Sequence, residues 1–232
     1  MGDPDEAKNF GNFQTNQSFH RFGVVTDNET IDPKLYDTAI SLFKRLGLKS
    51  VSMDDIAREL GISKKTLYQL VSNKEELIEK VMTYDFEQDK AMFVRHADEA
   101  TDAIDEFLRN SRYFIREMRE VSPTTMRDLQ KYYPKLWRDM FQAHHEQFQR
   151  DLVRNLERGM EEGLYRDNLE PEVIATLYSG MTGLVIDRQV FPNHERPLSD
   201  IIRQMTEYHF HGIVNQFGRE RLEQYLRTEA LE

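Results

Sequence analysis

The sequence has no cysteine in its 232 residues, so neither a disulfide nor a thiolate metal site can stabilise the fold. No apolar run approaches the roughly 18 residues of a membrane-spanning helix, and no signal peptide opens the chain. Its seven prolines and eleven glycines lie mostly between stretches of helical periodicity, and no stretch alternates like a strand. These absences predict an all-α protein that does not contact membranes, most simply located in the cytoplasm.

Catalytic and metal-binding patterns are also missing. None of the seven histidines follows a glutamate by three residues, as a di-iron helical bundle requires. His145-Glu146 begins like the zinc motif HExxH, but Gln149 stands where the second histidine belongs. No nucleophile elbow, P-loop or dinucleotide fingerprint is present. We therefore expect a binding protein without a metal or cofactor, and not an enzyme.

The net charge of −10 at first argues against nucleic acid as a partner. The charge is unevenly distributed, however: residues 1–30 carry −3, residues 31–83 carry +1 and residues 84–232 carry −8. Acidic side chains therefore lie mostly outside the segment 31–83.

Residues 51–77 have the pattern of two short helices joined by a tight turn. Ser52 and Asp55 form an S-x-x-D capping box at the start of the first helix. Gly61 stands where a helix end favours a left-handed residue, and Ser63 can cap the next helix.

The second of these helices is too short to be stable alone, so its neighbours must hold it. Its apolar residues Leu67, Leu70 and Val71 are predicted to face inward. The side chains left facing outward are Ser63, Lys64, Lys65, Thr66, Tyr68 and Gln69. This arrangement is typical of a helix-turn-helix whose second helix enters the DNA major groove.

Residues 33–83 resemble the DNA-binding domain of the TetR (tetracycline-repressor) family of transcriptional regulators. The matching residues are Ala39, Phe43, Gly47, Ser52, Ile56, Ala57, Gly61, Ile62, Ser63, Thr66, Leu67, Tyr68, Lys74 and Leu77. The sequence departs from the family pattern at Lys65, where glycine is frequent, and at Leu70 and Val71, where aromatics are favoured. These departures affect which operator the protein would read.

The resemblance implies a three-helix helix-turn-helix domain at 31–83 and a helical effector-binding and dimerisation domain at 84–232. It implies a homodimer on a palindromic operator of double-stranded DNA, regulated by a small-molecule effector and acting as a repressor. The candidate DNA contacts are Ser52, Ser63, Lys64, Lys65, Thr66, Tyr68, Gln69 and Lys74. Lys74 could meet a phosphate at a helix start, or it could be a solvated surface lysine.

Residues 1–30 are polar and predict a flexible tail. An alternative is an arm that uses His20 and Arg21 in a DNA minor groove. Asp32-Pro33 then begins a helix whose buried stripe is Leu35, Ala39, Leu42 or Phe43, and Leu46. A fourth helix, capped by Ser72 or Asn73, is expected to run through Tyr84 and to link the two domains.

The remaining chain predicts five helices, near 99–120, 124–132, 135–162, 171–190 and 198–217. Aromatic side chains at helical spacing in this body suggest a cavity for an apolar or aromatic molecule, neutral or cationic because the body is acidic. The candidate lining residues are Tyr113, Phe114, Trp137, Phe141, His144, Tyr178 and Met181. A close-packed core without a cavity is the alternative.

The last two predicted helices are apolar on more than one face, which requires two neighbours. One neighbour is the body itself, and the other is expected to be a second subunit. The candidate interface residues are Leu177, Gly180, Gly183, Leu184, Ile201, Met205 and Tyr208. The alternatives are a buried helix inside a monomer and, for the whole chain, a helical ligand-binding or interaction protein whose helix-turn-helix is only scaffold.

Overall fold

The computed structural model describes residues 33–186, 190–191, 197–228 and 231, so the predicted tail at 1–30 lies outside the described residues. The described residues form ten helices and no strand, apart from one isolated bridge between Tyr165 and Val214. The helices are α1 (Pro33–Leu46), α2 (Met53–Leu60), α3 (Lys64–Leu70), α4 (Lys74–Glu99), α5 (Ala103–Glu120), α6 (Pro123–Tyr132), α7 (Pro134–Glu161), α8 (Pro171–Ile186), α9 (Leu198–Ile213) and α10 (Gln216–Thr228). The all-α prediction is confirmed, and none of the described helices is long and apolar enough to cross a bilayer.

The first four helices enclose a small core of their own. Its buried members are Leu35, Ala39, Leu42, Phe43, Leu48, Val51, Met53, Ile56, Ala57, Leu67, Val71, Leu77, Ile78 and Val81. The predicted stripe of α1 is confirmed except at Leu46, which is exposed at the end of the helix. We call α1–α3 with the first two turns of α4 the reading head.

Helix α4 connects the reading head to the rest of the protein. Asn73 caps it by accepting a hydrogen bond from the Glu76 amide at 2.9 Å, and the Ser72 amide donates to the Glu76 carboxylate. Its start was predicted, but it continues to Glu99, well beyond Tyr84. One unbroken helix therefore leaves the reading head and packs against α5 and α7 of the body.

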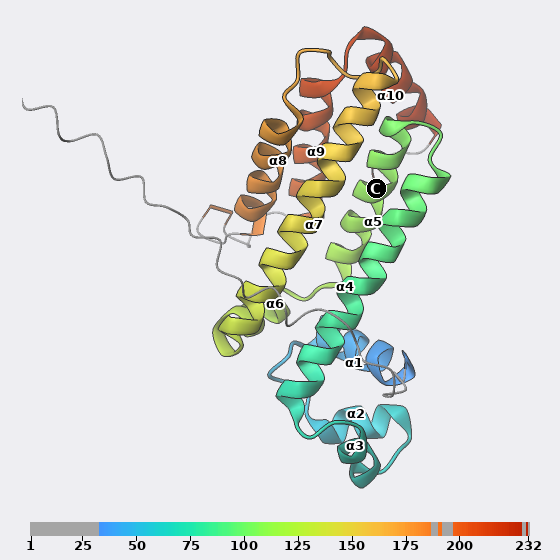
Figure 1. The fold of residues 1–232 in the computed structure, drawn as a ribbon. Coiled ribbons are helices and arrows are strands. Elements are labelled where there is room, and N and C mark those ends of the chain that lie inside the picture. Colours follow the sequence, from blue (N-terminus) through green and yellow to red (C-terminus); the bar gives the residue numbers. More distant parts are fainter. Residues whose placement is uncertain (1–32, 187–189, 192–196, 229–230, 232) are drawn as a thin grey trace, which may run out of the picture. The chain divides into compact units, whose positions relative to one another are not determined.

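The body is a bundle in which α5, α7, α8 and α9 run alongside one another (Figure 1). Its core gathers apolar side chains from all four helices. At the end of the bundle the Glu106 carboxylate, almost fully buried, pairs with Arg158 at 3.0 Å and Arg154 at 3.2 Å. These ion pairs join α5 to α7.

Helix α10 was not predicted as a separate element. The chain breaks after Ile213, and Asn215 both accepts from the Gly218 amide and donates to the carbonyls of Gly163 and Tyr165. Asp102 at the start of α5 then pairs with Arg221 of α10 at 3.0 Å. The helix predicted at 198–217 is therefore two helices, because Asn215 binds a distant loop.

Candidate nucleic-acid interface

The turn between α2 and α3 has the predicted geometry. The Ser52 hydroxyl accepts a hydrogen bond from the Asp55 amide at 3.2 Å, and the Ser52 amide donates to the Asp55 carboxylate at 2.9 Å. This reciprocal pair is the predicted capping box. The Ser52 hydroxyl, at 2.6 Å, and the Ser52 amide both donate to the Asp55 carboxylate and hold the pKa of Asp55 below its usual value. Gly61 ends α2 with φ +70, a left-handed conformation that glycine adopts without strain.

Helix α3 is capped and anchored at one point. The Ser63 hydroxyl accepts from the Thr66 amide at 3.0 Å, which confirms the predicted cap. Leu67 is the buried residue of this helix, and Val71 just beyond it is buried too. Leu70 was predicted to face inward, but it is 44% exposed, because Leu67 and Val71, one turn apart, form the buried face and Leu70 lies beside that face. The remaining side chains of α3 lie on an open surface.

The three lysines predicted to meet DNA differ in availability. Lys64 forms an ion pair with Asp54 of α2 at 2.7 Å. Lys74 is half-buried and donates to the Leu48 carbonyl, and burial lowers its pKa. Among the residues that the structure describes, none pairs with the side chain of Lys65, which is exposed. Of these three lysines, Lys65 is therefore the one whose ammonium is most available to bind a phosphate or a base.

The reading head is attached to α6 as well as to α4. The Ser122 amide donates to the Lys44 carbonyl at 2.7 Å, and the Thr125 hydroxyl donates to the Phe43 carbonyl at 2.7 Å. Carbonyls at the end of a helix have no partner within it, so these bonds from α6 complete α1. Leu129 of α6 is buried in the core of the reading head. This contact could not be predicted from the sequence, because its partners lie about 80 residues apart and carry no local signal.

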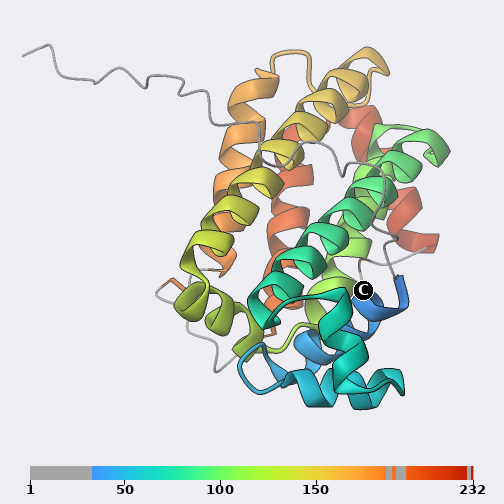
Figure 2. The same cartoon turned by 60° about the horizontal axis from the view of Figure 1, so that its bottom comes forward.

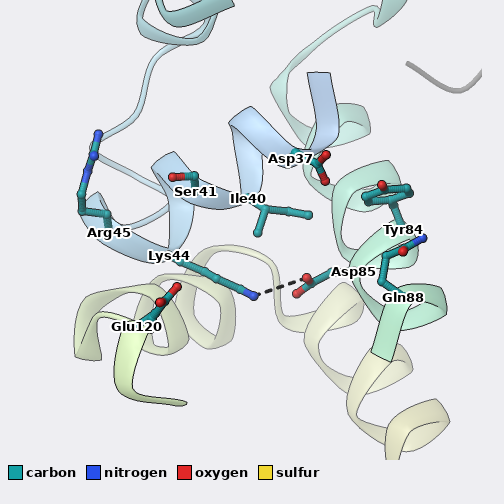
Figure 3. Close-up of a pocket in the computed structure, with 9 residues that line it drawn as sticks. All are labelled: Asp37, Ile40, Ser41, Lys44, Arg45, Tyr84, Asp85, Gln88 and Glu120. Atoms are coloured by element: carbon teal, nitrogen blue, oxygen red, sulfur yellow. Dashed lines mark hydrogen bonds and ion pairs between the residues drawn. The ribbon is translucent and has the colours of Figure 1, made fainter. Parts of the chain in front are cut away.

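An open cavity of about 500 Å³ lies where α1, α4 and α5 meet. Figure 3 shows Lys44 reaching from α1 toward Asp85 of α4, at 3.4 Å. Its ammonium also pairs with Glu117 of α5 at 2.9 Å. Burial raises the pKa of Asp85, while the carboxylates around Lys44 outweigh burial and raise the pKa of that amine. Lys44 thus joins the reading head to two helices of the body.

The structure divides the seven predicted ligand residues among three environments. Trp137 packs against the core of the reading head, whereas Phe114, Tyr178 and Met181 belong to the core of the body. Tyr113 faces α4 and donates to Asp89, and the ring of His144 lies 4.2 Å from that of Phe86. Phe141 lies 5.4 Å from Trp137, between ring centroids. A shared cavity among all seven stays a prediction.

Burial raises the pKa of Asp89 to about 6 and lowers the pKa of His144 to about 4. The half-buried region between α4, α5 and α7 therefore holds polar groups whose charged forms are disfavoured. Among the described residues, no group of three or more histidine or carboxylate side chains could hold a metal ion.

The residues predicted for a subunit interface lie mostly on an exposed face of α8 and α9. Leu177 is 60% exposed and Tyr208 is 73% exposed, and Leu184 and Val173 are exposed as well. Gly180 is also exposed, and a Cβ added there would meet nothing within 4 Å. Gly183 and Ile201 are half-buried.

Met205 is the exception among the interface candidates. It is buried in the core of its own chain, because it lies on the face of α9 that also carries Ile202 and His209. It is therefore not available to a partner surface.

Comparisons with known proteins agree with this architecture. Residues 35–81 match the family model of bacterial regulatory proteins of the tetR family. The chain is 22% identical over 186 residues to YvaF, an uncharacterized HTH-type transcriptional regulator of Bacillus subtilis strain 168, covering 79% of this chain and 96% of that protein.

Two solved structures have a similar fold. A protein from Saccharomonospora viridis, described as a transcriptional regulator and solved in complex with choline, is 18% identical with a TM-score of 0.63, covering 79% of this chain and 97% of that one. A TetR-family transcriptional regulator from Streptomyces coelicolor is 16% identical with a TM-score of 0.59, covering 79% of this chain and 95% of that one. The capped helix-turn-helix within residues 35–81 is therefore a domain of the tetR family of bacterial regulatory proteins, and the chain as a whole has the fold of solved transcriptional regulators of that family.

Proposed function

We propose that this protein is a ligand-responsive repressor that binds a palindromic operator as a homodimer. The observation that carries the proposal is α3, a short helix held by Leu67 and the Ser63 cap. It leaves Gln69 exposed, and it leaves Lys65 exposed and without an ion-pair partner among the described residues. A helix of this kind can enter the major groove and read base edges through its polar side chains. Of the other candidate contacts from the sequence, Thr66 and Tyr68 lie on this helix, and Ser52 caps the start of α2.

The homodimer is supported by the exposed apolar face of α8 and α9. Leu177, Leu184 and Tyr208 would lose much of their exposed area against the same face of a second copy. Burying apolar area is worth about 25 cal/mol per Å², so such a face favours association. A two-fold axis would also present two copies of α3 to successive major grooves.

Regulation would act through the two connections between body and reading head. An effector that binds the body more tightly in one position of α4 and α6 shifts the population toward that position. To change the ratio of the two positions from 1:99 to 99:1, the effector must bind one of them about 10⁴-fold more tightly than the other. The similar Saccharomonospora viridis regulator was solved in complex with a small molecule, choline, which supports an effector for the present chain. For the present chain we propose a neutral or cationic effector, since the body is acidic. We also propose that the protein acts by binding and not by catalysis. Its location would be the cytoplasm, where bacterial operators lie.

DNA binding can be tested by selecting genomic fragments with the wild-type protein and measuring affinity for the recovered operator. Lys65→Ala should weaken operator binding by about 1–3 kcal/mol if Lys65 contacts a guanine edge. Lys135→Ala is the matched control, because that exposed lysine lies on α7, outside the candidate DNA contacts, and is paired with Asp139. A protein that recovers no fragment above background would instead be a ligand-binding or interaction protein with a structural helix-turn-helix.

Dimerisation can be tested independently by sedimentation. Leu177→Asp should yield monomers at micromolar concentration and abolish tight operator binding, since its side chain is exposed and the fold does not need it. Val94→Asp places the same charge on another exposed apolar position, on α4, and should remain dimeric. A wild-type monomer would contradict the proposed interface. Quenching of Trp137, the single tryptophan, by a compound that also releases DNA would identify an effector.

A further inference from the structure

Two lysines lie on the ring of one exposed tyrosine next to the reading head. The Lys49 ammonium is 4.8 Å from the centroid of the Tyr132 ring and 3.1 Å from its hydroxyl. The Lys131 ammonium is 5.3 Å from the same centroid. Arg127 is exposed one turn earlier on α6, on the side that carries Lys131. We call Lys49, Arg127, Lys131 and Tyr132 the Tyr132 surface.

The cations of the Tyr132 surface are not balanced by carboxylates. Among the described residues, no side chain forms an ion pair with Lys49, Arg127 or Lys131, whereas Lys135 at the start of α7 pairs with Asp139. The Asp128 carboxylate lies nearby, but it is buried and accepts from the Lys49 amide at 2.9 Å. It offsets only part of the positive charge. In a chain with a net charge of −10, an unbalanced basic surface is a marked local excess.

The Tyr132 surface is fixed to the reading head. Lys49 lies in the loop between α1 and α2, three residues before the Ser52 cap. The other three residues belong to α6, which is held to α1 by Thr125 and by Leu129. Figure 2 shows α6 beside the loop between α1 and α2. Lys131 and Tyr132 therefore move with α2 and α3, although they lie about 60 residues further along the chain.

We propose that the Tyr132 surface is a second contact for the sugar–phosphate backbone of duplex DNA, outside the recognition helix. The inference rests on the proposed DNA-binding function and extends its interface to a helix of the body. Two ammonium groups, a guanidinium and a phenol hydroxyl can all donate hydrogen bonds to phosphate oxygens. Such contacts carry no sequence information, so this surface strengthens binding to every duplex and positions the reading head on it.

The test is the salt dependence of DNA binding by the full-length dimer. Each phosphate contact contributes about 0.9 to the slope of log K against log salt, so Lys131→Ala should reduce the slope by about 1.8 when both protomers lose one contact. The affinity for the operator and for an unrelated duplex of equal length should fall by the same factor. Lys131→Arg should retain the wild-type slope, because it keeps the charge.

Lys135→Ala is the matched control, since this exposed lysine lies three residues beyond the end of α6 and is already paired with Asp139. An unchanged slope in Lys131→Ala and in the Arg127→Ala/Lys131→Ala double variant, with Lys65→Ala still weakening operator binding, would overturn the inference and leave the proposed function intact. If the wild-type dimer binds no duplex, both are wrong. Thermal melts of each variant show whether a loss of affinity comes from unfolding.

Discussion

Two leucines in the same short helix should respond very differently to the same substitution. Leu67 is fully buried beneath α3, whereas Leu70, three residues later, is 44% exposed. Truncating a buried leucine to alanine costs about 2–5 kcal/mol, because the lost burial is compounded by a cavity. Since Leu67 is the buried side chain within α3, we expect a loss of about 3 kcal/mol for Leu67→Ala. Leu70→Ala should cost less than about 1 kcal/mol.

The consequence for DNA binding follows from the length of α3. Its seven residues cannot hold a helix without an anchor, so the loss of Leu67 loosens the segment that presents Lys65. Operator affinity falls by the factor by which the population with an intact α3 falls, which reaches roughly a hundredfold when the full loss of about 3 kcal/mol opens α3. The dimer, whose proposed contacts lie on α8 and α9, should be unaffected.

The measurement is urea unfolding of both variants by far-UV circular dichroism at one protein concentration, paired with operator titration and sedimentation. Dimer formation depends on concentration, so the comparison is valid only when it is held fixed. Equal destabilisation by the two substitutions would refute the burial argument. So would a Leu67→Ala protein that binds the operator like the wild type.

Acid should destabilise the protein, because burial lowers the pKa of His144 and of His209 to about 4 in the folded state. As the pH falls below about 6.5, both histidines are protonated in the unfolded chain before they are protonated in the folded protein, which favours unfolding. His209→Gln should therefore reduce the fall in unfolding midpoint between pH 7 and pH 5. Asp89→Asn should increase that fall, because a carboxyl with a folded-state pKa of about 6 binds a proton in the folded protein first and so stabilises it as the pH falls. Gly218→Ala should be far more destabilising than Gly61→Ala. The Cβ added at Gly218 would lie 2.0 Å from the Leu164 carbonyl oxygen. The Cβ added at Gly61 meets nothing within 4 Å, so this variant carries only the strain of φ +70. Thermal melts of the two glycine variants give this comparison directly.

The parts of the fold that follow from local chemistry were predictable from the sequence. The capping box at Ser52, the left-handed Gly61 and the Ser63 cap each depend on residues within a few positions of one another. Side chains this close can meet in almost any tertiary setting, so the pattern is sufficient to place the helix ends. The helix-turn-helix was predicted for this reason.

Features that depend on distant partners were not predictable. Leu70 has the same chemistry as Leu67, and only the face that α3 turns toward its neighbours decides which of them is buried. Asn215 looks like any polar residue in a helical stretch until its bonds to Gly163 and Tyr165 are known. Lys74 stands at a helix start suited to phosphate, yet its ammonium meets the Leu48 carbonyl. In each case the outcome depends on a neighbour supplied by the tertiary fold.

The burial of Leu129 among the side chains of the reading head bears on how this protein can be recombined. A fragment cut at the end of the helix-turn-helix would keep its recognition residues but leave a hole where Leu129 lies and remove the bonds that the Lys44 carbonyl accepts from Ser122 and Thr125. Exchanging reading heads between relatives at that boundary would pair one protein's α1 with another's α6. A functional chimera therefore has to include residues 123–132 of the protein that supplies the reading head. Without them, α1 and α6 would come from different proteins and their side chains would not be matched in packing.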